Sequence, residues 1–390
     1  MRGLSVRLAH SSPAPGPIAA GAAVARLDLT EFRSYASLRL APGAHPVALI
    51  GPNGAGKTNI LEAISFLAPG KGLRRARVAE PERRGAAQAW AVAAHVTRGS
   101  DEIRLGTGRG EGDKRILRVD GHSVRGQQDF AAAIAVVWLT PDMDRLFAEG
   151  PGARRRFLDR LVFGFDPEHA GRVAAYEHSM RERARLLAEG RGDAAWFASL
   201  EDSMARHGTA IAIARLQTVA RLARACRANV GPFPAPDLAL AGELETLVAE
   251  MPALAAEDRA REILAARRST DAESGTTGFG PHRADLAARW AAKNAPAGTL
   301  STGEQKALLI SLVLAYAREL AAERGSPPVL LLDEICAHLD PSRREALFDE
   351  LDALRAQYWA TGADPAAFAP LRERALFHAV RDGVCEPSRG

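Results

Sequence analysis

The spacing of apolar residues predicts strands in the first third of the chain. Between residues 24 and 140, short apolar runs alternate with turns that contain Gly and Asp, a pattern typical of β-strands. The run at 46–51 ends in glycine, as a buried strand does before a turn, and a Gly-rich segment and a helical pattern follow it. Three further runs over 90–119 predict an antiparallel meander, with Asp120-Gly121 as a hairpin turn.

The middle of the chain has the spacing of helices instead. After a last strand-like run at 133–141, apolar residues recur at intervals of three and four up to about residue 276, with arginines between them. A break is expected near Gly231-Pro232. An α/β pattern returns after residue 300. The elements expected there are a helix at 304–324, a strand at 329–333, a helix at 341–357 and a strand at 358–361.

These patterns predict an α/β head that is split in sequence, with an α-helical lobe inserted between its two parts. The first residues contain several Ser and Pro and no apolar core, so they are expected to form a disordered tail and not a secretion signal. The predicted segments are the tail at 1–22, the first part of the head at 23–140, the lobe at 141–276 and the second part of the head at 277–390.

Composition excludes several classes of protein. With 47% hydrophobic and 25% charged residues, the chain is expected to be globular. Its longest runs without a charge fall well short of the roughly 18 residues that cross a bilayer, so no membrane partner is expected. Cys226, Cys336 and Cys385 form no CxxC pair, which argues against a zinc site or a disulfide framework and favours a cytoplasmic location.

A phosphate-binding loop of the pattern GxxxxGKS/T lies between the strand at 46–51 and the following helix. In such a loop the backbone N–H groups surround the phosphates, the lysine places its charge on them, and the hydroxyl binds Mg²⁺. Lys57 and Thr58 are therefore candidate ATP and magnesium ligands. The whole loop consists of Gly51, Pro52, Asn53, Gly54, Ala55, Gly56, Lys57 and Thr58.

Two carboxylates follow the very apolar strand at 329–333. Taken alone, an apolar strand that ends in a solvated acidic turn can be purely structural. Together with the phosphate loop it predicts a second half of the same site, because the carboxyl ends of buried parallel strands open at one edge. Asp333 is then expected to hold Mg²⁺, and Glu334 to polarise the attacking water.

The segment LSTGEQK precedes the helix at 304–324. Ser301 and Glu304 have the spacing of a capping box, which accounts for both residues without any function. It does not account for LSxG followed by Gln and Lys. This segment, placed between GPNGAGKT and LLLDE, resembles the signature motif of ABC-type ATPases. That resemblance implies that Ser301 and Gly303 act in trans on a nucleotide held by a second subunit, with Asp340 at the dimer seam or simply as a helix cap.

Further segments resemble the RecF family of bacterial recombination mediators, whose helical insertion is compact. They are an FRNY-like segment at 29–35, a first signature at 141–159, a GPHR motif at 280–285 and a second signature at 331–347. By this resemblance Arg33 joins the expected ATP ligands. It also implies an ATP-dependent homodimer on gapped double-stranded DNA that works with RecR, RecO and RecA in replication and repair.

Hydrolysis is expected to be weak, DNA-dependent and used as a switch. No convincing Q-loop glutamine follows the strand at 133–141, although Gln127 and Gln128 lie nearby, and Thr361-Gly362 lack the switch histidine of transporters. A turnover well above about 10 per second would contradict this.

Basic clusters are the candidate DNA contacts, because a net charge of +4 does not itself specify DNA. Each is as readily a solvated or salt-bridged surface. The first cluster is favoured, since it follows the helix that leaves the phosphate loop, where ABC-type repair ATPases face duplex DNA. The clusters are Lys71, Arg74, Arg75 and Arg77, then Arg154 to Arg156, then Arg267 and Arg268.

Three other functions are compatible with a phosphate-binding loop. A transporter subunit leaves the long insertion unexplained, an SMC-like chromosome protein should show sustained heptads, and a small-molecule kinase would not need LSTGEQK. The motif around His282 has no role assigned by its residues.

Overall fold

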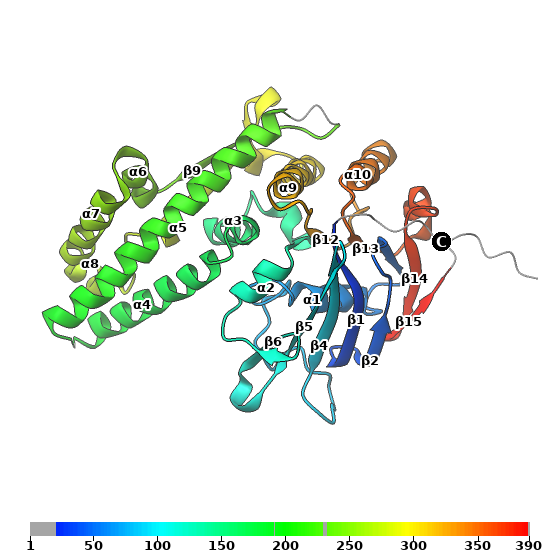
Figure 1. The fold of residues 1–390 in the computed structure, drawn as a ribbon. Coiled ribbons are helices and arrows are strands. Elements are labelled where there is room, and N and C mark those ends of the chain that lie inside the picture. Colours follow the sequence, from blue (N-terminus) through cyan, green and yellow to red (C-terminus); the bar gives the residue numbers. More distant parts are fainter. Residues whose placement is uncertain (1–20, 191, 229–231, 389–390) are drawn as a thin grey trace, which may run out of the picture.

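The computed structural model describes residues 21–190, 192–228 and 232–388. Figure 1 shows a head that contains the two large sheets and a lobe of helices that extends to one side of it. Nearly all of the predicted tail lies outside the described residues. Ala22, which the sequence analysis assigned to the tail, instead begins the first strand, so that boundary was wrong.

Both parts of the head contribute to one mixed sheet, in the order β15-β14-β3-β13-β12-β8. All neighbouring strands are parallel except β14 and β15. The predicted α/β head, split in sequence, is therefore confirmed, although the last two strands were not predicted. The strands are β3 (Val47–Ile50), β8 (Val136–Leu139), β12 (Val329–Leu332), β13 (Tyr358–Gly362), β14 (Leu376–Arg381) and β15 (Val384–Pro387).

A second sheet of the head is antiparallel, in the order β2-β1-β4-β5-β6-β7. It contains the predicted meander, and Val119 pairs with His122 across the predicted Asp120-Gly121 turn. Its strands are β1 (Ala22–Phe32), β2 (Tyr35–Leu40), β4 (Ala91–Arg98), β5 (Asp101–Arg109), β6 (Arg115–Val119) and β7 (His122–Ser123).

Helix α1 (Lys57–Ser65) packs between the two sheets, and α9 (Thr302–Arg324) and α10 (Pro341–Ala353) cover the other face of the mixed sheet. Strand β12 shows why this segment is so apolar. Val329 and Leu331 join the core around α1, whereas Leu330 and Leu332 join the core around α9 and α10. A strand that is buried on both faces requires apolar residues at every position.

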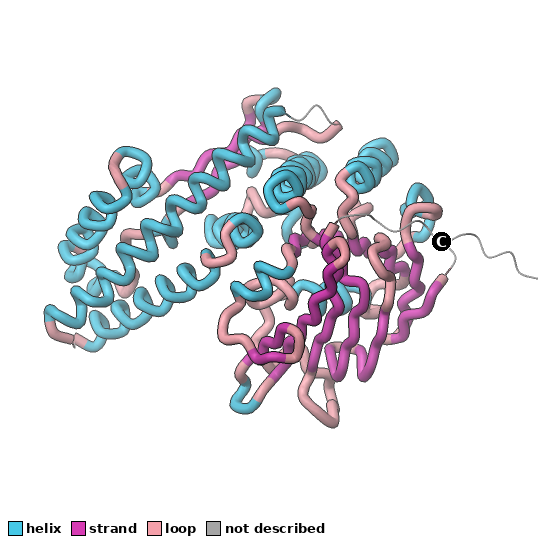
Figure 2. Tube along the Cα trace, in the orientation of Figure 1, coloured by secondary structure: helices cyan, strands magenta, loops and turns pink. Residues whose placement is uncertain are grey.

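The lobe consists mainly of helices, as predicted, with α4 and α5 running along its length (Figure 2). The helices are α3 (Pro151–Phe165), α4 (His169–Glu189), α5 (Ala194–Ala228), α6 (Glu243–Glu250), α7 (Ala253–Ala266) and α8 (Arg268–Ser274). None of the helices in the described ranges combines the length and apolarity that crossing a bilayer requires.

Two details of the sequence prediction were wrong. Strand β9 (Pro236–Ala241) lies inside the region predicted to be helical and pairs with β10 (Asp285–Trp290), which in turn pairs with β11 (Ala295–Pro296). Strand β9 is short, and its pairing with β10, which is far away in sequence, stabilises it. The strand expected at 133–141 is shorter, because the short helix α2 (Gln128–Ala133) precedes it.

Candidate nucleotide site

The phosphate loop connects the end of β3 to the first residue of α1. Gly54 and Gly56 have left-handed backbones, with φ of 81° and 114°. A Cβ at Gly56 would lie 2.8 Å from the hydroxyl oxygens of Ser34 and Tyr35. The Tyr35 hydroxyl also donates to the carbonyl of Gly56 at 3.2 Å. Glycine is therefore required at position 56 by both conformation and space.

Lys57, the first residue of α1, has only 4% of its surface exposed. Its ammonium donates to the carbonyl oxygens of Gly51 at 2.7 Å and Pro52 at 3.0 Å. The same nitrogen lies 3.3 Å from Oε1 of Glu334. The lysine charge is thus fixed between the loop backbone and the carboxylate that follows β12.

Thr58 and Asp333, predicted as magnesium ligands, are in direct contact. The Thr58 hydroxyl donates to Oδ1 of Asp333 at 2.9 Å. Thr361 donates to the same oxygen at 2.7 Å. Burial raises the pKa of Asp333, and the hydrogen bonds from Thr361 and Thr58 oppose that rise. A hydroxyl and a carboxylate brought together from α1 and β12 are hard oxygen donors, so this pair fits Mg²⁺.

Glu334 adopts an unusual backbone conformation beside this pair. Its φ is 47°, in the left-handed region that few residues other than glycine adopt. Its N–H donates to the Thr361 hydroxyl at 2.9 Å. About 29% of its side chain is exposed, so water can reach the carboxylate. A base that combines solvent access with a fixed backbone suits the role of polarising a water molecule.

The signature segment forms the start of α9, where Ser301 is the N-cap. The N–H of Ser301 donates to the Glu304 carboxylate at 2.9 Å, and the N–H of Glu304 donates to the Ser301 hydroxyl at 3.4 Å, so the predicted capping box is present. Glu304 also contacts Lys293. The hydrogen bond from the Lys293 ammonium is the main cause that lowers the pKa of Glu304 to about 2, and the hydrogen bonds from Ser301 add to the effect. Gln305 and Lys306 are buried and donate to backbone carbonyls, which anchors the helix.

The residues that were predicted to act in trans lie at the surface. Ser301 is exposed and Gly303 is partly exposed. Asp340 is also exposed and caps α10 by accepting from the N–H of Arg343 at 2.9 Å. In the described part of the chain, the side-chain contacts of Ser301 are with Glu304, and none reaches the phosphate loop.

Arg33 and Arg74 share a buried carboxylate on α1. Arg33, predicted as an ATP ligand, donates to Glu62 through two nitrogens, at 2.6 and 2.9 Å. Arg74, predicted as a DNA contact, lies 3.0 Å from Glu62 and 2.8 Å from Asn59. Its charge also opposes the raised pKa of Asp333. Arg74 therefore belongs to the surroundings of the nucleotide site, and both assigned roles stay predictions.

The remaining residues of the first basic cluster, Lys71, Arg75 and Arg77, are exposed. Two partly buried side chains, Arg115 of β6 and Gln127 just before α2, contact the start of the loop that carries them. Arg115 donates to the carbonyl of Gly70 at 2.6 Å, and Gln127 accepts from its N–H at 2.5 Å. This contact gives the Gln127 side chain a structural partner.

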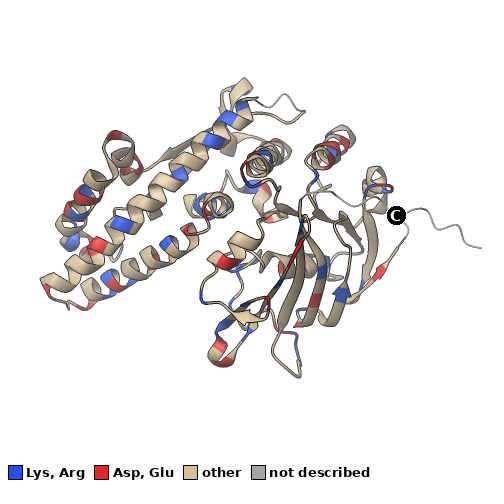
Figure 3. Cartoon of the chain, viewed as in Figure 1, with Lys and Arg blue, Asp and Glu red and all other residues tan. Residues whose placement is uncertain are grey.

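The other basic clusters are largely engaged within the protein. Arg154 forms a bidentate pair with Asp285 at 2.7 and 2.9 Å. Arg267 pairs with Glu243, and Arg268 with Glu201. Arg156 is exposed and close enough to Arg75 for their charges to repel. Over the lobe, basic and acidic residues are interspersed along the helices (Figure 3).

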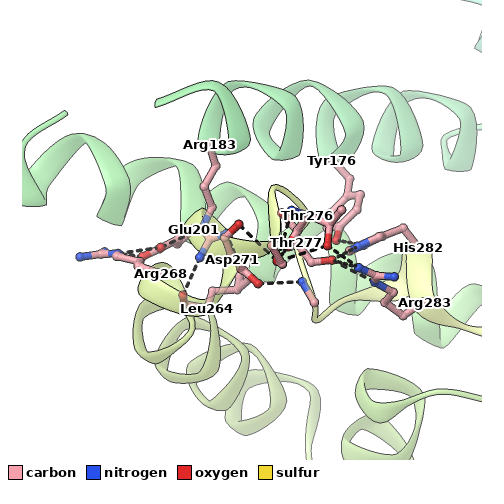
Figure 4. Close-up of polar contacts among 12 residues, drawn as sticks. Tyr176, Arg183, Glu201, Leu264, Arg268, Asp271, Thr276, Thr277, His282 and Arg283 are labelled. Atoms are coloured by element: carbon pink, nitrogen blue, oxygen red, sulfur yellow. Dashed lines mark hydrogen bonds and ion pairs between the residues drawn. The ribbon is translucent and has the colours of Figure 1, made fainter. Parts of the chain in front are cut away.

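The GPHR motif contacts helix α4 of the lobe, where His282 lies beside Tyr176 (Figure 4). Nε2 of His282 lies 2.8 Å from the carbonyl of Thr277, which can only accept, so this nitrogen carries the proton. The Tyr176 hydroxyl therefore donates to Nδ1 at 2.7 Å. Burial lowers the pKa of His282. A Cβ at Gly280, where φ is 132°, would lie 2.2 Å from the same hydroxyl. These contacts give the motif a structural role.

Sequence reasoning missed Thr361, Lys293 and Arg115. For Thr361 a signal existed, because it lies near the end of β13, the strand after which transporters carry the switch histidine. For Lys293 and Arg115 no motif or spacing gave a signal, because their partners lie elsewhere in the sequence.

The fold and the site define an ABC-type P-loop ATPase head that is assembled from two parts of the chain. The family described as RecF/RecN/SMC N terminal domain matches residues 23–369. The chain is 47% identical over 374 residues to the DNA replication and repair protein RecF of Mesorhizobium japonicum, with 94% of the chain and 98% of the relative covered. It is 48% identical to RecF of Rhizobium meliloti, with 92% and 97% covered. The chain belongs to the RecF family.

Solved structures agree with this fold. The recombination mediator protein RecF of the RecFOR pathway superposes with a TM-score of 0.81 at 20% identity, covering 95% of this chain and 99% of the other. A Smc head domain from Pyrococcus furiosus gives a TM-score of 0.51 at 17% identity, covering 94% and 96%. The similarity to SMC heads is thus one of fold, within the same broad family.

Proposed function

We propose that this protein is an ATP-dependent, DNA-binding recombination mediator that dimerises around two ATP molecules. The observation that carries the proposal is the meeting of Thr58 with Asp333 and of Lys57 with Glu334 at one edge of the sheet. The two relatives named above are RecF proteins, and a solved RecF is described with ATP. The same edge in a second subunit would be completed by Ser301 and Gly303, which lie at the surface and can face a partner's nucleotide.

In the proposed reaction each residue has a distinct task. The N–H groups of the loop and Lys57 bind the β and γ phosphates of ATP. Thr58 and Asp333 would hold Mg²⁺, which supplies positive charge to the phosphates when bound. Glu334 accepts a proton from the water that attacks the γ phosphorus, and ADP leaves with the electrons of the broken P–O bond. Hydrolysis is slow and opens the dimer.

The proposed DNA contact is the exposed loop with Lys71, Arg75 and Arg77. Contact through arginine and lysine is dominated by phosphates and is indifferent to sequence. In the proposed role, the closed dimer binds gapped duplex DNA in the cytoplasm, stimulates its own weak hydrolysis there, and with RecR and RecO supports the loading of RecA. The division into two head parts and a lobe is part of the proposal, with the first head part now starting at Ala22 and ending at 140, the lobe at 141–276 and the second head part at 277–390.

The test is sedimentation of the wild type and Ser301→Arg with ATP, with and without gapped duplex. The wild type is expected to form a dimer with ATP. Ser301→Arg should bind ATP as a monomer, because a bulky cation at the N-cap of α9 blocks the partner's nucleotide.

Ser37→Arg is the control, since Ser37 is an exposed serine on the antiparallel sheet. It should dimerise as the wild type does. A wild type that stays monomeric with ATP, or a Ser301→Arg variant that dimerises normally, would contradict the proposal.

A further inference from the structure

Thr361 occupies the point where the two halves of the nucleotide site meet. It lies near the end of β13, the strand between β3 and β12 in the sheet. It pairs with Leu49 of β3, and the preceding Ala360 pairs with Leu332 of β12. The strand that leads into the phosphate loop and the strand that leads into Asp333 are thus its two neighbours. The residue is fully buried, at 0% exposure.

Its hydroxyl uses both of its hydrogen-bonding functions on the acidic pair. It donates to Oδ1 of Asp333 at 2.7 Å, the same oxygen that accepts from Thr58 at 2.9 Å. It accepts from the N–H of Glu334 at 2.9 Å. One side chain therefore fixes the carboxylate of the first acid and the backbone of the second.

The backbone of Glu334 needs such a contact. A left-handed conformation at a residue with a side chain is strained, and the surrounding structure must hold it. The hydrogen bond from its N–H to Thr361 is one such constraint. The Glu334 carboxylate lies 3.3 Å from the ammonium of Lys57, which in turn donates to the carbonyls of Gly51 and Pro52 in the phosphate loop.

We propose that Thr361 is a positioning residue for ATP hydrolysis. It orients the carboxylate of Asp333 and holds the backbone from which Glu334 reaches the phosphate loop, and it acts through these two residues because its own side chain is fully buried. The inference rests on the proposed function and adds a residue to the site. In this role the hydroxyl of Thr361 matters and the volume of its side chain does not.

The test compares Thr361→Val, which keeps the shape and removes the hydroxyl, with Thr361→Ser, which keeps the hydroxyl. Thr361→Val should bind ATP and dimerise, but its single-turnover hydrolysis should fall by about 10²-fold, the order expected when a catalytic group is misplaced by about 1 Å. Its ATP-bound dimer, followed by sedimentation, should therefore persist longer than that of the wild type. Thr361→Ser should recover most of the rate.

Ser326→Ala is the matched control. Ser326 accepts from the N–H of Ala22 at 2.6 Å and donates to the carbonyl of Pro327, so this variant also removes two hydrogen bonds, but at the opposite end of β12. It should hydrolyse ATP as the wild type does. If Thr361→Val does not fold, Thr361→Cys, with similar volume and a weak donor, carries the same expectation.

Wild-type hydrolysis and dimer lifetime in the folded Thr361→Val or Thr361→Cys protein would overturn the inference. So would an equal fall in the rates of Thr361→Ser and Thr361→Val. A wild type that fails to dimerise with ATP would instead overturn the proposed function, so the two failures are distinct.

Discussion

Lys293 forms an ion pair with Glu304 at the N-terminus of α9. It lies in the turn after β10, 4.3 Å from the centre of the Trp290 ring, and contacts Glu304 in the first turn of α9. With its pKa lowered to about 2, Glu304 is ionised at neutral pH. Lys293 neutralises this carboxylate next to Ser301, and a helix N-terminus without excess negative charge favours an approaching phosphate.

Lys293→Ala is therefore expected to weaken ATP-dependent dimerisation. We expect a roughly 3- to 5-fold loss of dimer affinity, because an exposed ion pair contributes little. Sedimentation at several protein concentrations measures the change.

Lys293→Arg should retain the affinity, and Lys114→Ala, at an exposed lysine of the meander, should leave it unchanged. An unaltered dimer in Lys293→Ala would show that this pair has no part in the interface.

At the scale of elements, a buried polar group joins three helices of the lobe to the GPHR motif. Asp159 of α3 accepts two hydrogen bonds from Arg215 of α5, both at 2.8 Å, and one contact at 2.8 Å from His169 of α4. Arg215 also donates to the carbonyl of Pro281 at 2.6 Å. These contacts tie α3, α4 and α5 to each other and to Pro281 of the GPHR motif.

Asp159→Asn is expected to destabilise the protein by about 3–5 kcal/mol, because it leaves Arg215 buried without its charge partner. Urea denaturation measures the loss of stability. Asp166→Asn removes a more exposed pair with Arg172 and should cost about 1 kcal/mol or less. Equal effects of the two variants would contradict the assignment.

The same carboxylate predicts how stability depends on pH. Burial alone would raise the pKa of Asp159, but Arg215 and His169 outweigh it and hold the pKa at about 2. The unfolded value is about 3.9, so the stabilisation is fully present above that pH and disappears as pH falls toward 2. The Asp159→Asn variant should lack this loss of stability between about pH 3.9 and pH 2.

At the scale of the whole molecule, the clusters of positive charge differ in their availability. Most arginines in the described part of the lobe are paired with acids, whereas Lys71 and Arg75 lie exposed on a loop that Arg115 and Gln127 contact at Gly70. Arg77 is exposed on the same loop and lies 3.9 Å from Glu80. The loop follows α1, whose first residues are Lys57 and Thr58. A surface that binds DNA there would be close to the nucleotide.

Charge reversal at both Lys71 and Arg75 is expected to weaken binding to gapped duplex. It should also reduce the slope of log affinity against log salt by about 0.9 for each DNA phosphate that the variant no longer neutralises. Binding titrations at several salt concentrations measure both quantities. Arg74 is left unchanged, because its reversal would also disturb Glu62.

Arg206→Glu, an exposed position on α5, is the control and should alter neither quantity. If the double variant keeps the affinity and slope of the wild type, the loop does not bind the DNA.

The sequence by itself determined the phosphate loop, the strand before Asp333, the capping box at Ser301 and the split α/β head. These features depend on local rules: a turn that needs glycine, a strand buried on both faces and a helix that needs a cap. The tertiary structure alone decided the pairing of β9 with β10, the sharing of Glu62 by Arg33 and Arg74, and the contact of Thr361 with Asp333 and Glu334. These join residues that are distant in sequence, so they depend on how the sheets and helices pack.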